Sequence, residues 1–145
     1  GGTGLIGMWK AFVEIKSMGW VNDPLPRMVA AQSTGCAPVV KAFQERQRDT
    51  DFWENSDTVA LGLNVPGPLG GAWILDILRE SKGIAIMIDE QRLKALTEEF
   101  NNLTSINSSD EGGVVWGAYS HLKKVGWIKP KERSVIFATG IERIK

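Results

Sequence analysis

The sequence predicts an α/β fold with a mainly parallel sheet. Segments with helical spacing of apolar residues alternate with short apolar runs, at residues 28–33, 84–88 and 134–140. Each run is almost continuously apolar, as is typical of strands that are covered on both faces. No internal repeat or clear linker divides the 145 residues, of which 43% are hydrophobic and 23% charged, so we expect a single unit, 1–145.

The first third of the chain predicts a helix, a strand and a second helix. Apolar residues recur in steps of three and four from Leu5 to Ile15, which indicates one helical face, and Gly19 is suited to the C-terminal cap. After the proline-containing turn at 21–26, residues 28–33 predict a buried strand. Residues 35–49 then predict a helix that ends in a charged, solvated tail. Its inward-facing residues are Val39, Val40 and Phe43.

The middle of the chain begins with a segment that cannot be one regular element, because residues 55–71 are rich in glycine and proline. Residues 72–81 predict a helix that stops at Gly83, and residues 84–88 predict a strand. Asp89 is a good N-cap for the next helix. The residues on the apolar face of that helix are Leu93, Leu96 and Phe100.

The last third predicts a polar loop, a helix and a final strand. We expect residues 101–113 to form the loop, with a short strand at 104–106. Residues 114–125 predict a helix, and residues 134–140 a strand ending in Thr139-Gly140. The residues that we expect this helix to bury are Val115, Ala118 and Leu122.

Composition excludes several function classes. The charges of seventeen basic and seventeen acidic residues cancel, so the balanced net charge gives no reason to expect nucleic acid or an anionic membrane as partner. No apolar run reaches the roughly 18–20 residues that span a bilayer. Cys36 is the single cysteine, which excludes an internal disulfide and a cysteine-based zinc cluster and fits a cytoplasmic setting. His121 is the single histidine, which excludes chemistry that needs a pair of histidines. We therefore assign no metal ligand.

Two stretches carry candidate chemistry. The opening Gly1-Gly2-Thr3-Gly4 precedes a predicted helix, where backbone N–H groups and the helix dipole favour a phosphate; a simple glycine-rich turn is the alternative. Thr139 ends a predicted buried strand, where α/β folds place ligands, although a threonine that caps its own turn is the alternative.

Other conspicuous residues have structural explanations. Asp110 and Glu111 suit the N-terminus of a helix, and Cys36 suits a small buried site. We expect His121 on the surface, and we expect the tryptophans in packing positions. There are six tryptophans, and they include Trp9, Trp53, Trp73 and Trp116.

Taken in order, these blocks resemble the latter part of the threonine synthases, a group within the tryptophan-synthase-β-like, fold type II family of pyridoxal-phosphate enzymes. The resemblance covers nearly the whole chain and is most specific at residues 1–12, 25–43 and 78–93. The blocks are GGTGLIGMWKAF, LPRMVAAQSTGCAPVVKAF, TVALGLNVPGPLGG, ILRESKGIAIMIDEQRL, EGG and ATG.

The resemblance implies a fold and a cofactor site. The fold is a partial three-layer α/β/α unit, the C-terminal part of a fold type II enzyme. Gly1, Gly2, Thr3 and Gly4 are implied to bind the phosphate of pyridoxal 5'-phosphate through backbone amides, and Thr139 to face the pyridine nitrogen.

The resemblance also implies a reaction, the conversion of O-phosphohomoserine and water to threonine and phosphate by a lyase of threonine biosynthesis. No lysine here lies in the context of the family's Schiff-base lysine, which lies upstream in these enzymes, so we assign no catalytic residue and expect the isolated chain to be inactive. We expect an amino-acid phosphate as substrate of the full enzyme and self-association through an exposed sheet edge.

Two alternatives remain open from the sequence. The chain resembles, less closely, other fold type II enzymes, namely threonine dehydratase, cysteate synthase and diaminopropionate ammonia-lyase. It is also compatible with a non-catalytic binding or interaction module.

Overall fold

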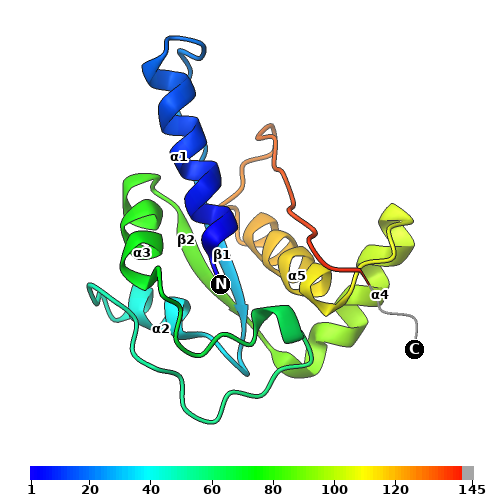
Figure 1. The fold of residues 1–145 in the computed structure, drawn as a ribbon. Helices are drawn as coiled ribbons and strands as arrows, with labels where there is room; N and C mark the ends of the chain where they lie inside the picture. The colour runs from blue at the N-terminus through cyan, green and yellow to red at the C-terminus, as the bar shows by residue number, and fades with distance from the viewer. Residues whose placement is uncertain (142–145) are drawn as a thin grey trace.

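A computed structural model describes residues 1–141, and residues 142–145 lie outside the described part. Its helices and strands follow the predicted alternation (Figure 1). In chain order they are α1 (Thr3–Ser17), β1 (Val29–Ser33), α2 (Pro38–Gln44), the 3-10 turn η1 (Leu61–Leu63), α3 (Gly71–Glu80), β2 (Ile84–Ile88), the 3-10 turn η2 (Glu90–Arg92), α4 (Leu93–Thr104) and α5 (Asp110–Lys124).

The two strands pair in parallel, which confirms the predicted sheet type. Val29 lies opposite Ile84, and Ser33 lies opposite Ile88. The parallel pairing requires the long crossover through α2, the irregular segment and α3 that separates the strands in the sequence. Both strands therefore end at the same edge of the sheet, which we call the carboxyl edge.

Side chains that alternate along the strands pack into two separate hydrophobic clusters. Ala30, Ala85 and Met87 join the cluster formed with α1, α2 and α3. Ala31, Ile86 and Ile88 join the cluster formed with α4 and α5. Helices thus lie on both faces of the sheet (Figure 1), and the two hydrophobic clusters lie between the sheet and these helices. This arrangement confirms the partial three-layer α/β/α unit.

Several local predictions are confirmed. Gly19 ends α1 with a φ of 73°, a left-handed conformation that a side chain disfavours. Asp89 caps η2, where its carboxylate accepts a hydrogen bond from the Gln91 backbone N–H. The residues predicted to be buried by α4 are buried: Leu93, Leu96 and Phe100.

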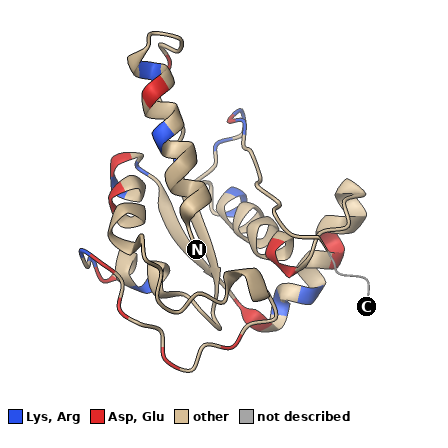
Figure 2. Ribbon diagram, viewed as in Figure 1, with Lys and Arg blue, Asp and Glu red and all other residues tan. Residues whose placement is uncertain are grey.

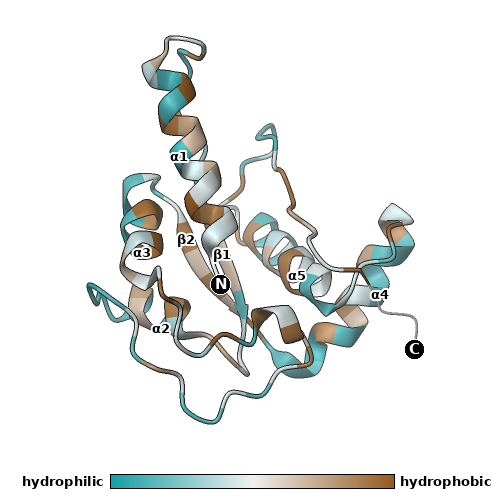
Figure 3. Ribbon diagram, in the orientation of Figure 1, coloured by the Kyte–Doolittle hydropathy of each residue, from teal (hydrophilic) through white to brown (hydrophobic). Residues whose placement is uncertain are grey.

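The predicted strand at 134–140 is wrong. The segment is extended, but none of its residues belongs to a strand. Ile141, the residue that follows it, forms an isolated bridge with Ser108. A groove separates the segment from β1, so no strand lies within hydrogen-bonding distance of it in the described part. Val135 and Phe137 are consequently 93% and 56% exposed, and Figure 3 shows this apolar segment running past α5.

Other boundaries also differ from the predictions. The short strand at 104–106 is wrong because α4 continues to Thr104 and Ser105 ends it in the left-handed conformation. The helix predicted over 35–49 ends at Gln44, and Arg46 adopts a positive φ. The last helix begins at Asp110 rather than at residue 114, so its first turn contains both acidic residues.

Burial also corrects two packing predictions. Val115 is only half-buried, whereas Val114 next to it is fully buried. Among the tryptophans predicted to pack, Trp20 and Trp73 are 74% and 68% exposed and do not pack in the core. Among the described residues, no helix is both long and apolar enough to cross a membrane.

Candidate functional site

The carboxyl edge carries a hydrogen-bond network centred on Glu90, which is half-buried. Its carboxylate accepts hydrogen bonds from the Ser33 hydroxyl and, at 2.6 Å, from the Val59 backbone N–H. Its own backbone N–H donates to the Thr34 hydroxyl at 2.8 Å. Residues that follow both strands therefore hold the irregular segment against the sheet.

The hydrogen bonds determine the charge of Glu90. Burial raises the pKa of the Glu90 carboxyl, but hydrogen bonds from Ser33, Val59 and Thr58 outweigh burial, and the pKa lies below its ordinary value. The carboxylate is therefore ionised at neutral pH, and it acts as an acceptor that orients the loop.

A glycine allows the irregular segment to approach closely. The Asp57 backbone N–H donates to the Gly35 carbonyl at 3.0 Å. A Cβ on Gly35 would lie 1.8 Å from the Asp57 carbonyl oxygen, well inside van der Waals contact. Only glycine fits this position without a backbone shift.

A second carboxylate, Glu111, holds the same segment from α5. Its Oε1 accepts a hydrogen bond from the Gly62 N–H at 2.6 Å, and its Oε2 accepts one from the Ser109 hydroxyl. Burial raises the pKa of the Glu111 carboxyl, but hydrogen bonds from Ser109, its own backbone and Gly62 outweigh burial, so the pKa lies below its ordinary value.

The N-terminus of α1 lies at this same edge. A Cβ on Gly1 would lie 3.9 Å from the Val65 side chain. Burial raises the pKa of the Cys36 thiol, and a backbone hydrogen bond from Val65 and the nearby positive N-terminus oppose the rise without cancelling it. Gly1, Cys36 and Val65 therefore lie close together just beyond the end of β1.

The first turn of α1 has the features of an anion site. Gly2 is the N-cap with a φ of 90°, and the first backbone bond within the helix runs from the Ile6 N–H to the Gly2 carbonyl at 3.1 Å. The N–H groups of Thr3, Gly4 and Leu5 thus have no acceptor within the helix. No side chain caps them and no acidic residue lies in the first turn, which Figure 2 shows free of charged residues.

Thr139 lies elsewhere on the rim of the site, beside the start of α5. The Ser109 backbone N–H donates to the Gly140 carbonyl at 3.4 Å, and a Cβ on Gly140 would lie 2.9 Å from Glu111 Oε2. The Thr139 side chain is exposed rather than placed at the end of a buried strand. Glu111 therefore lies between η1, where it bonds to Gly62, and the segment that contains Thr139. Two residues after η1 the chain reaches Val65, which lies beside Gly1.

The first turn of α1 fits the phosphate group of a pyridoxal cofactor. Three backbone donors converge at a helix N-terminus, and Gly2 allows the turn because a Cβ there would lie 2.2 Å from Ile74 Cδ1. The remaining single residues behave as predicted: Cys36 is buried, and His121 is exposed.

The fold and this site define a class, an α/β unit with a glycine-rich helix N-terminus at the carboxyl edge of a parallel sheet, the edge at which such folds place ligands. The family model of pyridoxal-phosphate dependent enzymes matches residues 1–140, and the chain therefore belongs to that family.

Curated relatives carry the names of two enzymes, threonine synthase and cysteate synthase. Threonine synthase of Methanosarcina acetivorans is 28% identical over 133 residues, which are 92% of this chain and 33% of that protein. Threonine synthase of Methanocaldococcus jannaschii is 27% identical with the same coverage. Cysteate synthase of Methanococcoides burtonii is 24% identical over 96% of this chain and 33% of its own length. The chain thus spans about a third of the length of these relatives.

A solved structure supports the fold alone. The structure of maize serine racemase superposes on this chain with a TM-score of 0.61 at 14% sequence identity. The superposed part is 84% of this chain and 36% of the racemase chain.

The sequence did not predict that Glu90 and Glu111 bind the backbone of the irregular segment. For Glu111 it predicted only a position at a helix N-terminus. A signal was present, because Ser33-Thr34 lies at the end of one predicted strand and Asp89-Glu90 directly follows the other, and parallel strands place such residues at one edge. The bond from Gly62 to Glu111 had no comparable signal, because it joins residues 49 apart across an irregular segment.

Proposed function

We propose that the chain forms the phosphate-binding part of a pyridoxal-phosphate-dependent lyase, a threonine synthase that converts O-phosphohomoserine and water to threonine and phosphate. The observation that carries the proposal is the first turn of α1, where three backbone donors without partners in the helix lie at the carboxyl edge of the sheet. The curated threonine synthases matched over 92% of the chain support the choice of reaction.

Each part of the proposed site has a distinct task. The N–H groups of Thr3, Gly4 and Leu5 bind the phosphate, and Gly1 and Gly2 allow the backbone to approach it. Thr139 is the residue that would face the pyridine nitrogen of a bound cofactor, and its neutral hydroxyl would leave that nitrogen largely unprotonated. When bound, the cofactor supplies the electron sink for the reaction.

No lysine of the chain is assigned to covalent attachment of the cofactor, and we propose that the isolated chain does not catalyse the reaction. A cysteate synthase is the second candidate, because one relative with that name matches 96% of the chain at 24% identity. Both candidates use the same phosphate site in this proposal.

Binding of pyridoxine 5'-phosphate, compared with unphosphorylated pyridoxine, tests the site by calorimetry. These analogues lack the aldehyde and cannot react with surface lysines. We expect the phosphorylated analogue to bind at least about tenfold more tightly, because backbone donors and the helix dipole contact only the phosphate.

Substitution of the helix N-cap provides the structural test. Gly2→Ala should weaken binding of the phosphorylated analogue about tenfold, since the added Cβ meets Ile74 and the φ of 90° disfavours a side chain. Gly7→Ala, where a Cβ meets nothing within 4 Å, is the matched control and should bind like the wild type. Equal affinity for the two analogues, or an unaltered Gly2→Ala, contradicts the proposal and favours a non-catalytic module.

A further inference from the structure

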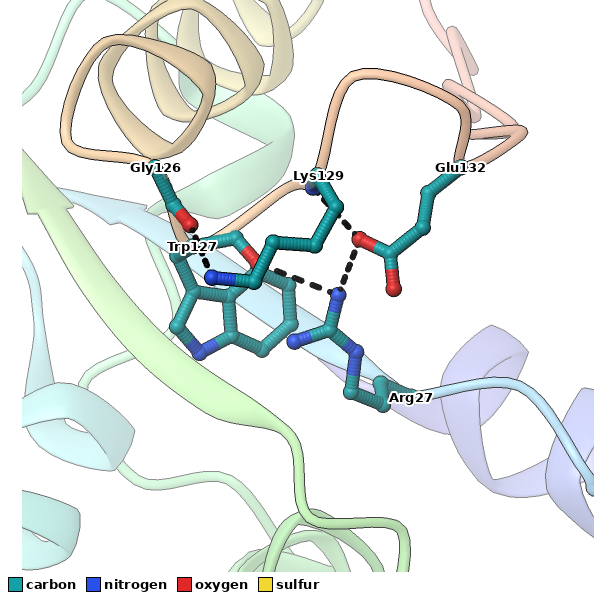
Figure 4. A network of polar contacts seen from close by, with 5 residues as sticks. All are labelled: Arg27, Gly126, Trp127, Lys129 and Glu132. Atoms are coloured by element: carbon teal, nitrogen blue, oxygen red, sulfur yellow. Dashed lines mark hydrogen bonds and ion pairs between the residues drawn. The ribbon is translucent and has the colours of Figure 1, made fainter.

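Arg27 holds the turn after α5, from which the extended segment 134–140 begins (Figure 4). The Arg27 guanidinium lies 3.7 Å from the centre of the Trp127 ring and donates to the Trp127 carbonyl at 3.2 Å. It also donates to Glu132 Oε2 at 2.7 Å, and the Lys129 N–H donates to the same oxygen at 2.6 Å. These contacts fix the start of the segment.

The end of the segment is held separately, at Gly140. The Gly140 carbonyl accepts hydrogen bonds from the Ser108 hydroxyl at 3.3 Å and from the Ser109 N–H at 3.4 Å. A Cβ on Gly140 would lie 1.9 Å from Ser109 Oγ, so the backbone of Gly140 packs directly against that hydroxyl. Between its two fixed ends the segment is mostly exposed. The contacts of Gly140 therefore determine where Thr139, the residue before it, lies.

Glu111 fixes the hydroxyl against which Gly140 packs. Its Oε2 accepts a hydrogen bond from the Ser109 hydroxyl and would lie 2.9 Å from a Cβ on Gly140. Its Oε1 accepts a hydrogen bond from the Gly62 N–H at 2.6 Å, which holds the carboxylate itself in place. One carboxylate thus joins η1 to the end of the segment that carries Thr139.

We propose that Glu111 is a positioning residue that, through Ser109, places the Thr139 hydroxyl against the pyridine nitrogen of the cofactor. The inference rests on the proposed function, in which Thr139 makes that contact. A hydroxyl that donates a hydrogen bond to the nitrogen favours its unprotonated form, so the position of Thr139 determines how readily the nitrogen takes up a proton. Removal of Glu111 should therefore affect the ring of a ligand and not its phosphate, which the N-terminus of α1 binds.

The ultraviolet spectrum of bound pyridoxine 5'-phosphate provides the first test, because absorption by the pyridine ring changes when its nitrogen is protonated. With the 145-residue chain in excess, we expect the pKa of this nitrogen to lie below that of the free ligand. Glu111→Ala and Thr139→Ala should both return the pKa to the free value. Asp110→Ala is the matched control and should keep the wild-type pKa, since Asp110 lies in the same helical turn but bonds to Thr97 of α4, at 2.9 Å.

Affinities for two ligands separate positioning from a general loss of structure. Glu111→Ala should weaken binding of pyridoxine 5'-phosphate about fivefold, as the loss of one hydrogen bond predicts. Binding of inorganic phosphate, followed by NMR at the backbone amides of the first turn of α1, should stay within about twofold of the wild type, because phosphate alone does not reach Thr139. The double variant Glu111→Ala and Thr139→Ala should lose no more than either single variant, since both act on one contact.

Two further variants test the same path if Glu111→Ala does not fold. Glu111→Gln keeps one oxygen that can accept from the Ser109 hydroxyl, so it should shift the nitrogen pKa only part of the way to the free value. Gly140→Ala leaves Glu111 in place but pushes the segment away from Ser109 Oγ, and it should shift the pKa as far as Thr139→Ala does.

The outcomes distinguish this inference from the proposed function. A wild type that binds pyridoxine 5'-phosphate no more tightly than pyridoxine overturns both. Selective binding with a nitrogen pKa that Thr139→Ala does not change overturns the pyridine contact and the positioning role, while the phosphate site stands. A pKa that responds to Thr139→Ala but not to substitution of Glu111 overturns the positioning role alone. An equal loss of affinity for both ligands in Glu111→Ala, the result of a merely structural role, overturns it as well.

Discussion

Two edges of the same small sheet differ in how their polar groups are satisfied. At the carboxyl edge, Glu90 and Glu111 accept backbone hydrogen bonds from Val59 and Gly62, so the irregular segment is fixed in place. At the lateral edge, the backbone groups of Val29 point into an apolar groove. At the carboxyl edge, residues of this chain hold the irregular segment in place, whereas no strand pairs with the other side of β1 in the described part.

This difference indicates where the described unit is stable by itself. A half-buried carboxylate that accepts several hydrogen bonds fixes its donors in one arrangement. An apolar groove with an open strand edge gains its stability only when another element covers it. Substitutions at the two edges should therefore differ in size, and the following predictions test that.

The largest effect is expected from Gly35→Ala at the carboxyl edge. The added Cβ would lie 1.8 Å from the Asp57 carbonyl oxygen, so the backbone of one segment must move. We expect the free energy of unfolding, measured with urea, to fall by about 3 kcal/mol. The matched Gly7→Ala meets no atom within 4 Å and should raise it by up to about 1 kcal/mol. Equal stability of the two variants would show that the carboxyl edge is not closely packed.

A smaller effect is expected from Arg27→Ala at the lateral edge. Its ion pair with Glu132 is partly exposed, and its guanidinium stacks on Trp127, so the loss of stability should be about 1 kcal/mol. Because the turn is released, trypsin should cleave faster after Lys131 and Arg133, as mass spectrometry would detect.

Two controls separate stacking from charge in this prediction. Arg27→Lys keeps the positive charge but loses the planar stacking and should give an intermediate cleavage rate. Arg48→Ala removes an exposed arginine elsewhere and should cleave at the wild-type rate. Unchanged cleavage in Arg27→Ala would contradict a role for Arg27 in holding the turn.

The two edges also differ in how far the sequence predicts them. The strands at 28–33 and 84–88 and the cap at Asp89 were predicted because apolar runs and capping residues act locally. The strand at 134–140 has the same apolar composition, yet it pairs with no strand in the described part, because pairing depends on a neighbour and not on the segment itself. The contact of Glu111 with Gly62 likewise depends on the path of an irregular segment, which no periodicity describes.

The smallest expected effect is the response of the carboxyl edge to acid. The pKa values of Glu90 and Glu111 are lowered by folding from an ordinary value of 4.5, so their contribution to stability is complete above about pH 4.5 and is lost as the pH falls through the lower folded-state values. Backbone amides of Val59 and Gly62 should then exchange faster, while those of β2 should remain protected.

In the double variant Glu90→Gln and Glu111→Gln, which cannot ionise at these positions, exchange at Val59 and Gly62 should be fast already at neutral pH and should change little on acidification. A wild-type loop whose exchange is equally slow at about pH 7 and about pH 3, after correction for the intrinsic rate, would show that the hydrogen bonds do not depend on ionised carboxylates. The carboxyl edge would then owe its closure to packing, as at Gly35, rather than to charge.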